Sequence, residues 1–169
     1  MSLGTTSVAV GVTSSHIKSL DLGDATFPIA LTQAITLLNG TGAGQADMVF
    51  TDTRTLSASA TEDLDLAASL VDAYGATMTF ARIKVIIVTA ASGNTNNVNV
   101  TRPASNGVPL FLAAGDGLAV RPGGVAVPLA CSDATGVPVT AGTGDLLTFT
   151  NSAGSTSVTY TVIIIGASA

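Results

Sequence analysis

The chain has 169 residues, of which 47% belong to the hydrophobic class and only 10% are charged, whereas soluble proteins carry about 25% charged residues. This length fits one domain with room for an appendage, and so apolar a composition excludes intrinsic disorder. The 6 basic residues are outnumbered by 11 acidic ones, which argues against a nucleic-acid partner.

Residues 1–38 differ from the rest of the chain and predict an N-terminal extension. Residues 4–13 are mostly Ser, Thr and Val with interspersed glycines. Between residues 27 and 37, large apolar side chains alternate with smaller ones, which favours a strand with one apolar face over a short helix at residues 31–38. The side chains on that face, which are candidate partner-binding residues, are Phe27, Ile29, Leu31, Ile35 and Leu37. The alternative is that residues 27–37 supply an edge strand to the main domain.

Residues 39–46 predict a glycine-rich hinge between this extension and a domain at residues 47–169. Glycines at alternate positions also occur in phosphate-binding loops. The spacing here does not match a dinucleotide loop, and residues 47–50 predict a strand where such a loop requires the N-terminus of a helix. The segment is therefore interpreted as a flexible connection.

The domain at residues 47–169 is predicted to be all-β, because it is rich in β-branched residues and repeatedly alternates with period two. Residues 145–150 and 157–162 are expected to form a hairpin across the turn-rich residues 151–155. The other predicted strands lie at residues 49–57, 64–66, 78–87, 98–102, 118–121, 125–129 and 137–140. About eight short strands with Gly, Asn and Pro turns between them favour an antiparallel β-sandwich or a barrel.

The segment Thr61–Tyr74 allows two interpretations. It fits a helix with acidic residues in its first turn, and it also fits a short strand through Leu64 and Leu66 followed by a turn. We favour the strand, because an isolated helix between two strands would need its own place on the core.

Neither a membrane span nor an export signal is expected. The longest strongly apolar runs, residues 85–88 and 162–165, have the length of a strand core, whereas a membrane helix takes about 18 apolar residues. Residues 1–15 contain no Lys, no Arg and no compact apolar block, so they do not resemble a signal peptide. A lone cysteine, Cys131, forms no internal disulfide. We expect synthesis in a reducing compartment and a fold held together by packing.

No catalytic residue, cofactor or metal site is predicted. His16 is the one imidazole, so a Ser-His-Asp or Cys-His mechanism would depend on it, yet it lies in the extension and far in sequence from Cys131. The acidic cluster of Glu62, Asp63 and Asp65 lacks the aromatic surroundings of a sugar-cleaving site and the ligand spacing of a calcium loop.

The charged residues are expected at edges or contacts. The acidic cluster is interpreted as solvated, or as forming salt links between subunits with arginines, for which the candidates are Arg54, Arg82 and Arg102. Arg82 and Lys84 alternate with apolar residues in an otherwise buried strand, so both are expected near a wet edge or against a partner. A cluster of asparagines is compatible with sugar binding, with stacking between copies or with a polar hairpin tip: Asn94, Asn96, Asn97 and Asn99.

Seven segments distributed along the chain together carry a resemblance to a known family: Asn39–Asp47, Thr53–Leu56, Asp63–Leu66, Asp72–Gly75, Phe80–Lys84, Val120–Gly124 and Thr156–Tyr160. With them, residues 39–166 resemble a small virion protein of tailed bacteriophages, of the capsid decoration (cement) family. The segments contain no catalytic motif. The resemblance implies a β-sandwich of jelly-roll type that forms homotrimers on the capsid lattice.

The implied function is to bind the major capsid protein and further copies of the chain on the capsid exterior, without catalysis. A low-charge surface suits a protein present in many contacting copies, and an apolar-faced extension could add a strand to a partner. The protein would be made in the cytoplasm of the host bacterium and would bind neither nucleic acid nor membrane. The alternative is a phage tail or fibre-associated protein that binds host glycans. The absence of Trp and the single His disfavour a sugar hydrolase.

Overall fold

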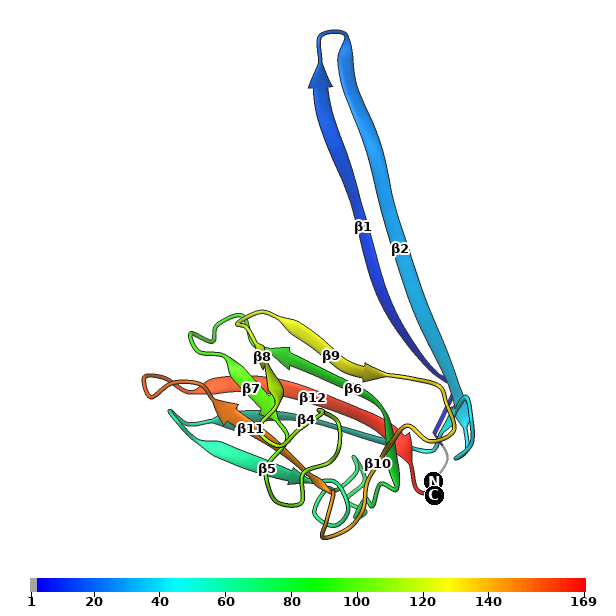
Figure 1. Cartoon of the computed structure of the whole chain (residues 1–169), viewed down its shortest axis with the longest axis vertical. Coiled ribbons are helices and arrows are strands. Elements are labelled where there is room, and N and C mark those ends of the chain that lie inside the picture. Colours follow the sequence, from blue (N-terminus) through cyan, green and yellow to red (C-terminus); the bar gives the residue numbers. More distant parts are fainter. Residues whose placement is uncertain (1–2) are drawn as a thin grey trace.

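The computed structural model describes residues 3–169, which form a body and a long arm (Figure 1). The arm is an antiparallel hairpin of β1 (Thr6–Leu20) and β2 (Gly23–Asn39) that projects away from the body. The short β3 (Gln45–Ala46) pairs in parallel with the end of β2. Residues 27–37 pair with β1 and with no strand of the body, so the alternative that they form an edge strand of the main domain is wrong.

The body consists of two sheets. One sheet has five strands: β4 (Met48–Leu56), β12 (Val158–Ala167) and β6 (Arg82–Ala90) lie side by side in that order, and both β9 (Val125–Ala130) and β10 (Val137–Pro138) pair with the other edge of β6. The other sheet has four strands in the order β5 (Thr61–Asp65), β11 (Leu146–Asn151), β7 (Val98–Thr101) and β8 (Gly117–Val120). Every pairing within the two sheets is antiparallel.

The two sheets face each other across one apolar core, as alternation with period two predicts for strands buried on one face. Phe149 of β11 and Tyr160 of β12 stack across it with ring centroids 4.6 Å apart. The all-β prediction is confirmed, since residues 3–169 contain no helix, but they form twelve strands rather than about eight. The arm accounts for two of the additional strands.

The segment Thr61–Tyr74 forms a strand followed by turns, so the favoured interpretation is confirmed and the helix is wrong. β5 ends at Asp65, whose carboxylate oxygen Oδ1 accepts hydrogen bonds from the backbone N–H groups of Ala67 at 2.9 Å and Ala68 at 3.1 Å. An aspartate that bonds the backbone two residues later stabilises a turn in competition with a helix or strand.

The predicted hairpin of residues 145–150 and 157–162 is also wrong, because β11 and β12 lie in opposite sheets. The connection is an arch. The buried Asn151 stabilises it, since its Nδ2 donates to the carbonyl oxygens of Ser57 at 2.9 Å and Thr156 at 2.7 Å. In this arrangement the apolar faces of β11 and β12 meet across the core. A hairpin would instead place the two strands side by side in one sheet.

Candidate assembly surface

The arm is a regular hairpin with an unbroken register from the Thr6–Leu37 pair at its base to the Leu20–Gly23 pair at its tip. The tip is a two-residue loop. Gly23 beside it has a positive φ of 136°, which residues with a side chain rarely adopt. With about 3.4 Å per residue, a strand of this length spans about 50 Å. The arm therefore projects much farther from the body than an ordinary surface loop does.

The register gives the arm one apolar and one polar face, because even-numbered residues of β1 lie beside odd-numbered residues of β2. The polar face carries mainly Ser, Thr and Ala. The opposite side, called here the apolar face of the arm, also includes His16, Lys18 and Gln33, and its large apolar side chains are Val8, Val10, Val12, Leu20, Phe27, Ile29, Leu31, Ile35 and Leu37. All five apolar residues predicted to bind a partner lie on it.

The β1 half of this face was not predicted. Its signal in the sequence is the alternation of Val8, Val10 and Val12 with small residues. Gly23 and Asp24 after the tip mark a turn, where Ser19 Oγ donates to Asp24 Oδ1 at 2.6 Å. The many glycines and serines of this segment lower its apolar content, so the alternation is weak in the sequence.

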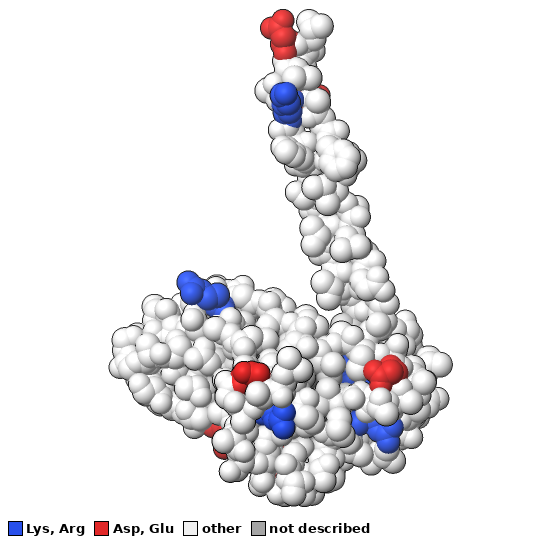
Figure 2. All heavy atoms as spheres, in the orientation of Figure 1, with Lys and Arg blue, Asp and Glu red and all other residues white. Residues whose placement is uncertain are grey.

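The base of the apolar face is covered by the chain's own body. Leu37 and Val8 pack against Val85 of β6 and Ile165 of β12, and Leu37 is 0% exposed. Farther along the arm this cover ends: Phe27, Ile29 and Leu31 are 69%, 43% and 64% exposed. Figure 2 shows charged side chains on the arm only toward its tip. The arm thus carries an apolar surface outward from a buried root, with Lys18 near the tip as the charged side chain of that face.

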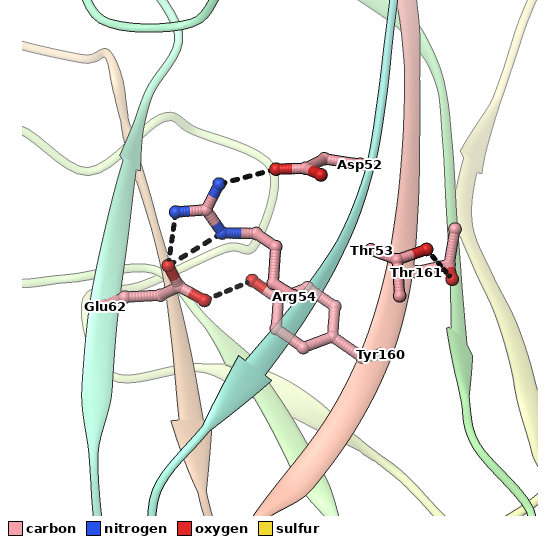
Figure 3. Close-up of polar contacts among 6 residues, drawn as sticks. All are labelled: Asp52, Thr53, Arg54, Glu62, Tyr160 and Thr161. Atoms are coloured by element: carbon pink, nitrogen blue, oxygen red, sulfur yellow. Dashed lines mark hydrogen bonds and ion pairs between the residues drawn. The ribbon is translucent and has the colours of Figure 1, made fainter.

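This surface continues onto the outer face of the five-stranded sheet. The residues that share that face in the register include no charged side chain: Val49, Thr51, Thr53, Thr55, Val85, Ile87, Thr89, Val125, Thr159, Thr161, Ile163 and Ile165. Threonines on neighbouring strands of this face form hydrogen bonds with each other. For example, the Oγ1 atoms of Thr53 and Thr161 lie 2.8 Å apart (Figure 3). We call this face and the apolar face of the arm together the assembly surface.

Lys84 connects the root of the arm to the body. Between Ile165 and Gly166 the pairing of β12 with β6 shifts by one residue, which leaves Lys84 as the extra residue of a bulge, and bulges redirect side chains. The Lys84 side chain is 0% exposed and its Nζ donates to the carbonyl oxygen of Gly42. The expectation of a wet edge is therefore wrong for Lys84, whose partner lies in its own chain.

The segment predicted as a hinge, residues 39–46, is hydrogen-bonded to the body and within itself. Gly44 N–H donates to the carbonyl oxygen of Ser132 at 2.7 Å, and Gly42 N–H donates to Gln45 Oε1 at 2.9 Å. Gly40 has a φ of 138°, and a Cβ there would lie 2.6 Å from Gln45 Oε1. The glycines are thus explained by a tight turn around the Gln45 side chain.

Arg54 belongs to a polar cluster at the β4 and β5 edges of the body (Figure 3). Its guanidinium lies 2.6 Å from Glu62 Oε2 and 2.8 Å from Asp52 Oδ2, so the salt link predicted for Glu62 occurs within one chain. The hydrogen bond to Glu62 is the main reason that the pKa of Arg54 is raised. Tyr160 OH donates to Glu62 Oε1 at 2.8 Å, and burial together with this bond raises the pKa of Tyr160 far above its ordinary value.

The other two candidate arginines bind loops of the same chain. Arg82 Nη1 donates to the carbonyl oxygen of Ala134 at 2.6 Å, and Arg102 Nη1 donates to that of Phe111 at 3.0 Å. The structure therefore brings the five apolar candidates together on one surface, while the three arginines lie apart from them in contacts within the body.

The groups considered for catalysis are not assembled into a site in residues 3–169. His16 is exposed on the arm, and Cys131 is half-buried beside Asp133, where burial first and then the Asp133 carboxylate raise the pKa of the thiol to about 11. No three His, Cys, Asp or Glu side chains in this range are grouped to hold a metal ion. An open hollow of about 470 Å³ contains Asp47 and Asp72, whose carboxylates accept hydrogen bonds from neighbouring protein groups.

Two of the clustered asparagines, Asn94 and Asn96, form hydrogen bonds within the body. Asn96 is buried and its Nδ2 donates to Asn151 Oδ1 at 3.1 Å and to the carbonyl oxygen of Thr156 at 3.2 Å. Asn94 exchanges hydrogen bonds with the backbone of Thr159 at 2.8 Å. These amides hold the loops at one end of the body.

Comparisons with family models, with curated proteins and with solved structures found no match to this chain. Within residues 3–169 there is no helix of the length and apolarity needed to cross a membrane.

Proposed function

We propose that this protein is a structural component of a bacteriophage head, which it decorates and stabilises by binding the major capsid protein and its own copies without catalysis. The observation that carries the proposal is the exposed apolar face of a long arm. A two-stranded ribbon is at best marginally stable in water, and large exposed apolar patches on soluble proteins mark interaction sites. Such an arm is suited to lie against another protein.

The choice of a phage head rests on the resemblance of residues 39–166 to capsid decoration proteins. With it we propose a jelly-roll type of sandwich for the body and a trimer as the assembled form. The uncharged outer face of the five-stranded sheet supports a role in assembly, because it continues the apolar face of the arm without a charged side chain. The outer face of the five-stranded sheet is therefore compatible with close packing against a protein shell.

Two features of the arm favour tight binding. Burial of one Leu or Phe side chain contributes about 1.5–3 kcal/mol, and Phe27, Ile29 and Leu31 all have exposed surface left to bury. The root of the arm is already ordered by Lys84 and by the packing of Leu37. Less conformational entropy is therefore lost on binding than for an unfolded tail.

The test is occupancy on heads that lack the protein, compared between two neighbouring substitutions. Leu31→Asp places a charge on the apolar face, and Thr32→Asp places the same charge on the polar face of the same strand. Leu31→Asp is expected to lower the affinity for heads about tenfold or more, because an apolar contact is lost and a carboxylate is desolvated. Thr32→Asp is the control and is expected to bind like the wild type.

The proposal is wrong if the wild type does not bind heads at saturating concentration, or if both substitutions have the same effect. Labelling of whole virions separates the tail alternative. If the label for this protein lies on the tail, and added host glycan competes for its binding, the glycan-binding function would replace the head proposal.

A further inference from the structure

The outer edge of β1 is a long strand edge without a partner in the chain. β1 is the terminal strand of the sheet β1-β2-β3, and all 15 of its residues, Thr6–Leu20, pair on one side only. An open edge presents a row of free backbone N–H and C=O groups to any strand that can align with it.

The register shows which groups these are. Because a two-residue loop joins Leu20 to Gly23, this pair is hydrogen-bonded, and hydrogen-bonded pairs alternate with non-bonded ones down the arm. Even-numbered residues of β1 therefore direct their N–H and C=O groups to β2. The odd-numbered residues from Ser7 to Ser19 direct theirs outward, and their side chains are small except for Ile17.

The other free edges in the described part of the chain are interrupted or short. On β2, Pro28 belongs to a non-bonded pair with Ser15, so its missing N–H lies on the outer edge. β9 contains Pro128, and β5 and β8 have only 5 and 4 residues. β4 carries the charged pair Asp52 and Arg54. Prolines, charges and short strands all hinder pairing with a second chain, and β1 has no such protection over most of its length.

We propose that the outer edge of β1 pairs antiparallel with the same edge of a second copy of this chain. A copy of β1 is the one long unprotected edge that residues 3–169 offer as a match. Two-fold pairing joins two marginal ribbons into a four-stranded sheet with one continuous apolar face, and three or more strands with such a face are stable where two are not. When the pairing is centred on Thr13, Lys18 lies opposite the apolar Val8, so the two copies do not place like charges together.

The shape of the molecule permits this contact. The arm extends well clear of the body, and antiparallel pairing places the two bodies at opposite ends of the joined arms (Figure 1). The inference specifies how the proposed function joins copies of the chain, but it needs no capsid. The arm contact remains two-fold whatever symmetry the bodies adopt.

The experiment compares two proline substitutions at one cross-strand pair, Thr13 and Ala30. Both residues belong to a non-bonded pair, so each substitution removes an outward N–H and leaves the β1–β2 hydrogen bonds in place. Thr13→Pro removes it from the β1 edge, and Ala30→Pro removes it from the β2 edge. Sedimentation of the purified full chain over about a hundredfold range of concentration measures the association.

Thr13→Pro is expected to halve the mass of the wild-type assembly, or to raise its dissociation constant about tenfold or more, and Ala30→Pro is expected to leave both unchanged. A second readout needs no substitution. Amide hydrogen exchange at Ala9, Thr13 and Ser15 should slow as the wild-type concentration rises, whereas exchange at Val10 and Val12 should stay constant.

A wild type that remains a monomer throughout overturns the inference, as do equal effects of the two prolines or exchange at the odd-numbered residues that ignores concentration. Because capsids are absent, these results are independent of whether the protein binds heads. Failure to bind heads with intact pairing would refute only the proposed function.

Discussion

The Lys84 ammonium group, fully buried, donates a hydrogen bond to the carbonyl oxygen of Gly42 and so connects a bulge in β6 to the turn from which the arm emerges. A charge buried without an acidic partner is costly unless hydrogen bonds compensate for the lost water. Its position at the root therefore indicates a role in directing the arm rather than in adding stability to the body.

Lys84→Met tests this role. The body is expected to stay folded, with a free energy of unfolding within about 2 kcal/mol of the wild type, because Met is apolar and of similar length. Amide hydrogen exchange at Gly44 and Gln45 is expected to become faster as the root loosens. Lys18→Met, on the exposed part of the arm, is the control and should change neither quantity. Unchanged exchange in Lys84→Met would show that packing of Leu37 alone directs the arm.

Tyr160 makes stability sensitive to alkaline pH. Its pKa is raised by burial first and by the hydrogen bond to Glu62 second. A raised pKa contributes stability that is complete below the ordinary value of about 10 and is lost as the pH rises above it. Urea unfolding from pH 8 to pH 11 should therefore show a falling free energy of unfolding. Tyr160→Phe should reduce that fall, and Tyr74→Phe, which alters an exposed phenol, should not.

The Cys131 thiol is expected to react slowly. Its pKa is raised to about 11, by burial first and by Asp133 second, and the thiolate is the reactive form. At pH 8 its reaction with a disulfide reagent such as Ellman's should be about a hundredfold slower than that of free cysteine, whose pKa is about 8.5. Unfolding in urea should restore the fast reaction. Asp133→Asn should accelerate it in part, and a fast reaction in the native wild type would contradict the prediction.

Asn151 stabilises the arch between β11 and β12. Asn151→Ala removes the donor to the carbonyl oxygens of Ser57 and Thr156. It should lower the free energy of unfolding by about 2–4 kcal/mol, because these hydrogen bonds are lost and the buried amide of Asn96 loses its acceptor, Asn151 Oδ1. Asn99→Ala, on the outer face of β7, is the control and should change it by about 0.5 kcal/mol or less. Urea unfolding measures both, and equal effects would exclude a special role for Asn151.

Patterns of neighbouring residues predicted much of the local structure. Period-two alternation is a local property, so the strands of the body and the apolar face through Phe27 and Leu31 could be found from it. The strand and turn at Thr61–Tyr74 were favoured for a different reason, namely that an isolated helix would have needed its own place on the core. The alternation in β1 is as regular but weaker in apolar side chains, and it was missed.

Which strands pair could not be found in this way. The stretches before and after Asn151 have the pattern of a hairpin, but they belong to opposite sheets because both apolar faces must meet one core. Lys84 and Arg54 are charged residues whose partners, Gly42 and Glu62, are near only in the fold. Low charge, strand composition and the apolar face were therefore determined by the sequence itself. The projecting arm, its free edge and its buried root depend on contacts between distant segments, and only the tertiary structure decided them.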